Sequence, residues 1–370
     1  LLISSSRRRI VVHSPAQSGV VFPSLHFFIP HSPLVAPRKL RNERRFFVTP
    51  RLPPPLFSLF LCNIPHIVQP HHRSGGAFIP LSFLFAMKIL ITGAAGFVGC
   101  RATRFLGLSH QVIPLNSKQL DVTDEEMIHT LFMDHAPRAV IHMAALSDTA
   151  YCEAHPDDCE AVNYIGTLNV ARAAAAVGAK LIYASSDQVY NGCTETGLLG
   201  EDVPLAPKGV YAALKYRTEC EVQELLPTAV ALRLSWMYDV PNSPLRQNHG
   251  LLLRLLEAAR SGVPFAASVN ECRGITNVWQ VVRRIEAAIA LPGGIYNFGS
   301  PNRCSTHDTV LEAARFLAAA GHLEAGSASP VNAVEAPQRN LAMNLHRIEQ
   351  FGLTFPDTIS GLKAALLHGA

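Results

Sequence analysis

The feature that most constrains the fold of this chain is the glycine-rich segment 87–99. A short apolar run leads into the spacing Gly93-x-x-Gly96-x-x-Gly99, after which the sequence is compatible with a helix. This order predicts a buried strand, a tight turn and a helix N-terminus. Such a turn directs backbone N–H groups and the positive end of the helix dipole toward a pyrophosphate. The segment therefore predicts a dinucleotide-binding site at the first strand of an α/β fold.

Strand and helix patterns alternate along the chain after this segment. Apolar strand patterns occur at 88–92, 111–115, 139–143, 180–185 and 228–233, with helical patterns near 97–107, 124–135, 159–178 and 208–226. This alternation predicts parallel strands joined by right-handed helical crossovers, which is the doubly wound sheet of the Rossmann fold. Ligands bind outside the carboxyl ends of the strands in such sheets, so we expect functional residues in the loops that follow the strands.

The alternation loosens beyond residue 233. Helical patterns occur at 247–261, 276–290 and 305–320, and a strand pattern lies near 294–298. We expect an NAD(P)-binding domain over 87–233 and a smaller, mixed substrate-binding lobe over 234–370. Within that second part, 276–298 is expected to return to the main sheet.

Residues 1–86 differ in composition from the rest. They contain ten Lys or Arg against the single acid Glu43, and 12 of the 26 prolines. No apolar periodicity lasts long enough there for a helix or a strand. We interpret this part as a disordered or non-native extension upstream of Met87. An organelle transit peptide is the alternative if the extension is native.

Charge and cysteine content narrow the function class. Residues 87–370 contain 22 basic and 27 acidic residues, and this net negative charge argues against a nucleic-acid-binding surface. The eight cysteines include no Cys-x-x-Cys pair, so we expect reduced thiols in a cytoplasmic protein and no metal site. Pro80 interrupts the one apolar stretch that resembles a membrane span, so we expect no membrane partner.

The loops after the second and third strands indicate how a cofactor is held. An NAD-selective site usually has an acid after the second strand, but here that position reads Asn116-Ser117-Lys118. We expect NADP to be tolerated, with a solvated Lys118 as the alternative. After the third strand, Ala144 and Ala145 are small enough to lie flat against a cofactor. His142 lies in an apolar run and is expected to be a packed core histidine.

A candidate catalytic set follows the fourth strand. Ser185 and Ser186 lie at its carboxyl end, and Tyr211 follows 25 residues after Ser186. The spacing Tyr211-x-x-x-Lys215 places a phenol and an ammonium on one helix face. We expect the ammonium to lower the pKa of the phenol, so that Tyr211 can exchange a proton near neutral pH.

These motifs together resemble the extended short-chain dehydrogenase/reductases. Four segments are similar to the branch of dTDP-4-dehydrorhamnose reductases: Leu-Asp121-Val-Thr-Asp, Ser185-Ser-Asp-Gln-Val-Tyr190, Arg233-Leu-Ser-Trp-Met-Tyr238 and Arg273-Gly-Ile-Thr276. The resemblance extends over 87–370. It implies an oxidoreductase that uses NADP or NAD to reduce the keto group of a nucleotide-linked sugar.

The resemblance also implies a role for each matched residue. Tyr211 is the acid/base at the sugar keto oxygen, Lys215 holds the nicotinamide ribose, and Ser186 hydrogen-bonds the reacting oxygen. The remaining substrate residues are Ser185, Asp187, Trp236 and Arg273. The implied cofactor contacts are Gly93, Gly96, Phe97, Val98 and Gly99 at the pyrophosphate, Asp121 and Val122 at the adenine, Ala144 and Ala145 in the groove, and Asn163, Tyr211 and Lys215 beyond it. The aromatic Phe265 is expected to be ordinary packing.

The chain departs from that branch in places, and two other functions stay open. Phe97-Val98 stands where the reductases more often have Gln-Leu, and Asp239 where they usually have Gly. The alternatives are a sugar-nucleotide epimerase and a non-catalytic, cofactor-binding regulatory subunit, since the branch includes a partner of methionine adenosyltransferase. A dehydratase is disfavoured because Asp187-Gln188 replaces the usual Asp-Glu pair. The family often forms dimers, so a homodimer is also expected.

Overall fold

The computed structural model describes residues 86–241, 243–248, 250–323 and 330–368. The interpretation of 1–86 as a disordered, non-native or targeting extension therefore lies outside the described residues, apart from Ala86. Among the helices of the described part, none is long and apolar enough to cross a membrane.

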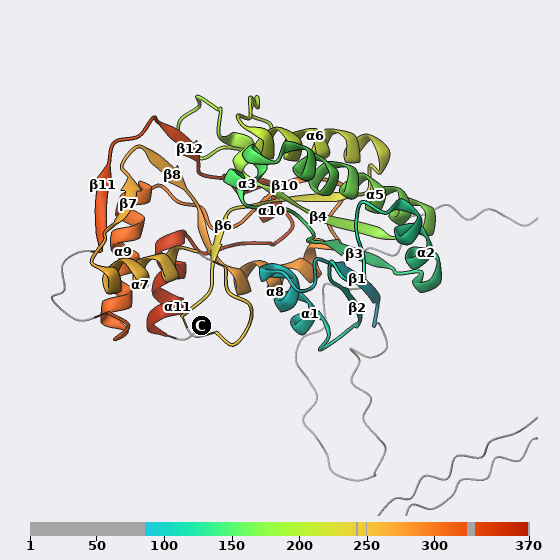
Figure 1. The fold of residues 1–370 in the computed structure, drawn as a ribbon, viewed down its shortest axis with the longest axis horizontal. Coiled ribbons are helices and arrows are strands. Elements are labelled where there is room, and N and C mark those ends of the chain that lie inside the picture. Colours follow the sequence, from blue (N-terminus) through green and yellow to red (C-terminus); the bar gives the residue numbers. More distant parts are fainter. Residues whose placement is uncertain (1–85, 242, 249, 324–329, 369–370) are drawn as a thin grey trace, which may run out of the picture. The chain divides into compact units, whose positions relative to one another are not determined.

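A parallel sheet of six strands forms the centre of the fold (Figure 1). Its spatial order is β10-β5-β4-β3-β1-β2, and every neighbouring pair is parallel. The strands are β1 (Lys88–Thr92), β2 (Gln111–Leu115), β3 (Ala139–His142), β4 (Lys180–Ser186), β5 (Val230–Leu234) and β10 (Gly294–Phe298). This topology confirms the doubly wound parallel sheet.

Helices cover both faces of the sheet, which explains why its strands read as continuous apolar runs. Ile89 and Ile91 of β1 pack with α1 (Phe97–Leu106) and α8 (Val278–Ala288) on one face. Leu90, between them, faces the other core, against α2 (Glu125–His135) and α5 (Gly166–Val177). The helix α6 (Val210–Leu225) packs beside α5 on that second face.

The helix expected near 159–178 is confirmed, with a difference in its hydrogen bonding. The helical residues run from α4 (Pro156–Cys159) through a π-helical turn η2 (Glu160–Ile165) into α5, and a separate helix α3 (Thr149–Ala154) precedes them. Apolar spacing cannot distinguish a π turn from an α turn over so few residues, and π turns recur at functional positions. The turn carries Asn163, one of the predicted cofactor residues.

The second part of the chain forms a smaller lobe with its own core, while β10 lies beside β5 in the main sheet. Phe265 is buried in that smaller core, which confirms that it is packing. Three short parallel strand pairs, β6–β9, β7–β11 and β8–β12, organise the lobe. Its elements are β6 (Trp236–Tyr238), α7 (Leu251–Ser261), β7 (Phe265–Ser268), β8 (Glu271–Arg273), β9 (Ile275–Asn277), α9 (Thr306–Ala319), β11 (Val331–Val334), β12 (Arg339–Leu341) and α11 (Thr358–Leu367). The short helix α10 (His346–Glu349) packs instead beside β10, in the core of the main sheet.

Candidate active site

The glycine turn between β1 and α1 forms a cradle of bare backbone. Gly93 has a φ of +66°, and a Cβ on it would lie 2.6 Å from the backbone N of Ala144. A Cβ on Gly99 would lie 2.1 Å from the carbonyl oxygen of Gly93. The N-cap of α1 is Gly96, which supplies no capping side chain. The first N–H groups of the helix are therefore left for a ligand, and the cradle fits a pyrophosphate.

The loop after β3 forms the neighbouring wall of this cradle. Ala144 and Ala145 are half-buried. Asn163 accepts a hydrogen bond from the backbone N of Leu146 and donates one to its carbonyl, each at 2.8 Å. The Asn163 side chain is fully buried. Both ends of its amide are thus occupied by the backbone, so Asn163 positions the loop that carries Ala144 and Ala145.

The segment after β2 is held in place by its own hydrogen bonds. Asp121 accepts bonds from the backbone N and the hydroxyl of Thr123, at 2.9 and 2.8 Å, and these bonds lower the pKa of Asp121. Val122 is buried, and Asn169 donates to its carbonyl at 3.3 Å. Asp121 is exposed and Lys118 lies in the same exposed loop. Both are available at the edge where an adenosine would lie.

The candidate catalytic residues meet at the carboxyl end of β4. The Ser186 hydroxyl accepts a bond from the backbone N of Gln188 at 3.2 Å and donates to Asp187 at 3.3 Å. Tyr211, in the first turn of α6, interacts with the Ser186 side chain. One helical turn later, the Lys215 ammonium donates to the Ala184 carbonyl at 3.0 Å and lies 5.8 Å from the centre of the Tyr211 ring.

The expectation that Lys215 lowers the pKa of Tyr211 is wrong. Burial raises the pKa of Tyr211, and its contact with Ser186 opposes this only in part. Burial also lowers the pKa of Lys215, to about 8. In a low-dielectric site the neutral form of each group is favoured. At neutral pH, Tyr211 therefore retains its proton and can donate it.

His142 is a buried core residue, as expected. It is 2% exposed and its ring nitrogens contact the hydroxyls of Thr92 and Thr167, at 2.7 and 3.0 Å. Burial lowers its pKa to about 3, with a further contribution from Lys215. His142 is neutral at pH 7 and both of its nitrogens are used.

Ser185 is directed into a buried polar network below the site. Its hydroxyl donates to Glu219 of α6 at 2.5 Å, and Arg233 of β5 binds the same carboxylate through two donors, at 2.9 and 2.7 Å. Arg233 also donates to the Tyr190 hydroxyl at 2.7 Å. Because Glu219 lies two turns after Tyr211 on one helix, the network fixes how α6 sits against β4. Ser185 therefore supports the site from beneath.

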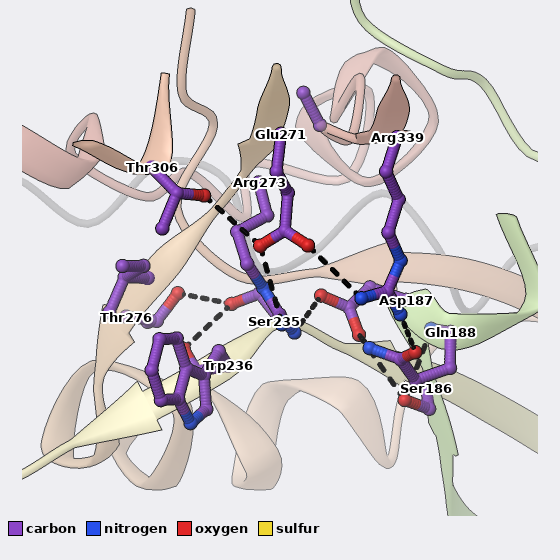
Figure 2. Close-up of polar contacts among 12 residues, drawn as sticks. Ser186, Asp187, Gln188, Ser235, Trp236, Glu271, Arg273, Thr276, Thr306 and Arg339 are labelled. Atoms are coloured by element: carbon purple, nitrogen blue, oxygen red, sulfur yellow. Dashed lines mark hydrogen bonds and ion pairs between the residues drawn. The ribbon is translucent and has the colours of Figure 1, made fainter. Parts of the chain in front are cut away.

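Charged side chains of alternating sign, most of them from the smaller lobe, lie next to the loop after β4 and form the substrate-side wall of the candidate site (Figure 2). Arg273 of β8 pairs with Asp187 at 2.8 Å, and its guanidinium lies 5.1 Å from the centre of the Trp236 ring. Arg339 of β12 pairs with Glu271 at 3.0 Å and donates to Gln188. Glu271 lies between the two arginines, 4.0 Å from Arg273. The predicted residues Asp187, Arg273 and Trp236 are thus brought together.

Sequence reasoning missed several residues of this wall. Gln188 follows Asp187 directly, which is the one signal that could have drawn attention to it. Glu271 and Arg339 carry no local signal, since their contacts come from distant strands. Glu153 of α3 was also missed, although it accepts a bond from the backbone N of Val210 at 2.7 Å and so caps the helix that carries Tyr211.

A pocket of about 240 Å³ opens beside the Tyr211 ring. Its walls come from α3, the loop after β4, the start of α6 and β12. The lining residues are Thr149, Ala150, Glu153, Gln188, Asn191, Lys208, Tyr211, Ala212 and Arg339. Hydrogen-bonding groups and two cations surround a concave space next to a proton donor, as a polar substrate with anionic groups requires. The described residues hold no cluster of His, Cys, Asp and Glu able to bind a metal ion.

The chain was compared with known proteins. The model of the RmlD substrate binding domain matches residues 87–366. The spore coat polysaccharide biosynthesis protein SpsK of Bacillus subtilis is 26% identical over 224 residues, which cover 60% of this chain and 76% of that protein. A dTDP-4-dehydrorhamnose reductase of Burkholderia thailandensis is 27% identical over 290 residues, 73% of this chain and 95% of the reductase. Methionine adenosyltransferase 2 subunit beta of Rattus norvegicus is 32% identical over 159 residues, 41% of this chain and 47% of that subunit.

Solved structures share the fold. A dTDP-4-dehydrorhamnose reductase from Bacillus anthracis, in complex with NADP, superposes with a TM-score of 0.67 at 23% identity, covering 77% of this chain and 99% of that one. A UDP-glucose 4-epimerase from Thermus thermophilus, complexed with NAD, gives a TM-score of 0.61 at 23% identity, covering 76% and 98%. These likenesses confirm the Rossmann architecture.

Proposed function

The chain belongs to the family defined by the RmlD substrate binding domain, and from that premise we propose that it is an NAD(P)-dependent reductase of a nucleotide-linked keto-sugar. One observation carries this proposal. A protonated Tyr211 stands against Ser186 at a pocket, on the sheet edge that also holds the glycine cradle. Relatives named dTDP-4-dehydrorhamnose reductase support the same chemistry, because one of them matches over 95% of its length.

The cofactor is NADP or NAD. The glycine cradle would hold the diphosphate through backbone N–H groups, and Phe97, Val98 and the small residues after β3 would line its groove. Asp121 and Val122 would lie along the adenine, and Lys215 at the nicotinamide ribose. When bound, the cofactor supplies the hydride.

The protein supplies the proton and the orientation. Tyr211 donates its phenolic proton to the keto oxygen as that oxygen gains negative charge, and Ser186 donates a hydrogen bond to the same oxygen. Lys215 stabilises the phenolate that remains. Without substrate the Ser186 hydroxyl donates its one proton to Asp187, which is itself held by Arg273, so the hydroxyl would turn from Asp187 to the keto oxygen when the sugar binds.

The substrate-side residues are assigned to a nucleotide-linked sugar. Tyr211, Gln188 and Arg339 line the pocket, and Lys208 adds a second cation to its rim. The Trp236 ring, whose centre lies 5.1 Å from the Arg273 guanidinium, is assigned as an aromatic face for the sugar nucleotide. Cations and an aromatic face next to a proton donor suit a sugar with an attached diphosphate.

We also propose that the protein forms a homodimer and that it is located in the cytoplasm.

The test begins with the chain from Met87 onward. Purified protein is incubated with NADPH or NADH and a panel of nucleotide-linked 4-keto sugars, and absorbance at the nicotinamide band is followed. We expect consumption of one cofactor with at least one sugar. In Tyr211→Phe we expect turnover to fall about 10²- to 10⁴-fold with cofactor binding retained, because only the proton donor is lost.

The matched control is Tyr151→Phe, a tyrosine 41% exposed on α3 whose hydroxyl bonds Asp158. That variant should turn over like the wild type. Undiminished turnover in Tyr211→Phe would refute the assignment of the proton donor.

A regulatory subunit is the second candidate, because a methionine adenosyltransferase subunit is 32% identical over part of this chain. It predicts that the protein binds cofactor and consumes none with any sugar. An epimerase predicts interconversion of nucleotide sugars with no net consumption of NADPH. The same assay, followed by chromatography of the sugars, separates all three.

A further inference from the structure

Residues 239–248 connect β6 to α7 and pass beside the glycine turn; we call this part, with the exception of Asn242, the connecting segment. In Figure 1 it is the yellow loop that runs from β6 toward α1. It starts at Asp239, the residue that stands where the related reductases usually have Gly. The segment belongs to the smaller lobe by sequence but lies against the cofactor-binding turn.

Arg101 of α1 anchors the connecting segment. Its Nε donates to Asp239 at 3.1 Å, its Nη2 contacts the same carboxylate, and both side chains are completely buried. Its Nη1 donates to the carbonyls of Phe97 and Arg246, at 2.7 and 2.9 Å. Removing two charges from water is costly unless the pair is well hydrogen-bonded, as this one is. The pair therefore fixes the position of the segment, and it neutralises the cation that α1 itself carries.

Arg246 then reaches from the connecting segment back to the turn. Its Nη1 donates to the carbonyl of Ala95 at 3.3 Å, between Gly93 and Gly96. Its side chain is exposed, and no ion pair to a carboxylate is found for it among the described residues. A guanidinium has five N–H donors, and within the part of the chain that the structure describes only one of them is engaged. Among those residues Arg246 is thus a cation without a carboxylate partner, at the rim of a neutral backbone cradle.

We propose that Arg246 binds the diphosphate of NADP or NAD, as a charge that the connecting segment adds to the glycine turn. The inference rests on the proposed function, since it assumes that the cradle holds a dinucleotide. The cradle by itself offers only neutral N–H groups and a helix dipole, whereas a diphosphate carries two negative charges. A planar guanidinium can bind such oxygens with two parallel hydrogen bonds.

The test is direct binding of ligands to Arg246→Ala. The nicotinamide fluorescence of NADPH and of NADH is titrated against the wild type and the variant, and dTDP is titrated by calorimetry. We expect the Kd of both cofactors to rise by the same factor, about tenfold, because a charge-assisted hydrogen bond is lost. The Kd of dTDP should not change. The salt dependence of NADH binding should also become shallower in the variant.

Two controls keep the comparison clean. Arg315→Ala removes an arginine that is 70% exposed on α9, away from the turn, and should leave every Kd unchanged. Arg246→Gln keeps the length and polarity of the side chain without its charge, and should resemble Arg246→Ala. Thermal unfolding of each variant verifies that it is folded.

The remaining outcomes overturn the inference in distinguishable ways. Weakened binding of NADPH alone would place Arg246 at the ribose 2′-phosphate. Weakened binding of dTDP alone would place it at the substrate. Unchanged binding of all three ligands would make it a surface residue. If the wild type binds neither cofactor, the proposed function itself fails.

Discussion

The two walls of the candidate active site are built in opposite ways. The cofactor side is a cradle of backbone, in which Gly93 and Gly99 are required because any side chain would collide with neighbouring main chain. The substrate side is made of charged side chains, with Arg273 and Arg339 joined to each other through Glu271 and each bound directly to the loop after β4. The first wall comes from consecutive residues, and the second from strands far apart in the sequence.

This difference indicates which wall tolerates change. The glycine turn binds through its backbone, so a side chain added there is either accommodated without effect or blocks the ligand. A side-chain network can lose one member and retain the others, at a cost set by how deeply the lost charge was buried. We therefore expect substitutions in the glycine turn to weaken cofactor binding strongly. Substitutions in the charged wall should weaken substrate binding by smaller amounts that differ from residue to residue.

The largest effect is expected for Gly93→Ala. Its Cβ would lie 2.6 Å from the backbone N of Ala144, and its φ of +66° is strained for alanine. To relieve the overlap the turn must move, so we expect NADPH affinity to fall about 100-fold or more, equivalent to about 3 kcal/mol. Fluorescence titration measures this.

Gly178→Ala is the matched control, because Gly178 also has a φ of +66° and a Cβ there meets nothing within 4 Å. It should cost about 1 kcal/mol of stability through backbone strain alone and leave the Kd of NADPH unchanged. Equal losses of affinity in the two variants would show that strain, rather than the collision with Ala144, limits binding.

A smaller effect is expected when the charged wall is broken. Arg273→Gln removes the partner of Asp187 in a side chain that is only 12% exposed, so the loop holding Ser186 loses an anchor. We expect KM for the nucleotide-linked sugar to rise about tenfold with the Kd of NADPH unchanged. Steady-state kinetics and fluorescence titration measure the two quantities separately.

Arg339→Gln should raise KM less than Arg273→Gln, because the Arg339 side chain is 35% exposed and its pair with Glu271 is partly screened by water. The reverse order of the two effects would mean that the pocket contact of Arg339 matters more than the pair beneath Ser186.

The smallest expected effect is the pH dependence that the Lys215 ammonium gives to the reaction. Burial lowers its pKa from 10.5 to about 8, whereas Tyr211 stays protonated throughout this range. The ammonium that stabilises the phenolate is lost as the pH rises through 8, so we expect the rate of reduction to decline several-fold between pH 7 and pH 9. The pH profile of kcat/KM for reduction measures this.

Folding stability should move in the opposite direction over that range. Between pH 8 and 10.5 the unfolded chain binds a proton at Lys215 that the folded chain does not, so the contribution of this residue to the free energy of unfolding increases with pH. Lys215→Met should remove this slope and, at pH 7, stabilise the fold by about 2 kcal/mol while abolishing turnover. Lower stability of that variant at pH 7 would contradict the burial cost assigned to Lys215.

The sequence predicted those parts of the fold that depend on neighbouring residues. The strand expected at 294–298 and the first two strands have the observed bounds, because each is an apolar run between clear turn signals. The proposed catalytic set could be predicted for the same reason, since the spacing of Tyr211 and Lys215 on one helix is a local property. The helix near 159–178 follows from the same kind of local pattern, but its π turn, which carries Asn163, leaves no signal in the apolar spacing.

The sequence by itself determined that this chain folds as a doubly wound sheet with a glycine turn shaped for a dinucleotide, because those features follow from periodicity and from residues lacking a side chain. Only the tertiary structure determined the protonation states of the site residues and the ion pairs that they form. Burial reversed the expected pKa shift of Tyr211, and pairing over long separations placed Arg273 on Asp187 and Arg101 on Asp239. Desolvation and pairing depend on what surrounds a group in space, and spacing along the chain does not contain that information.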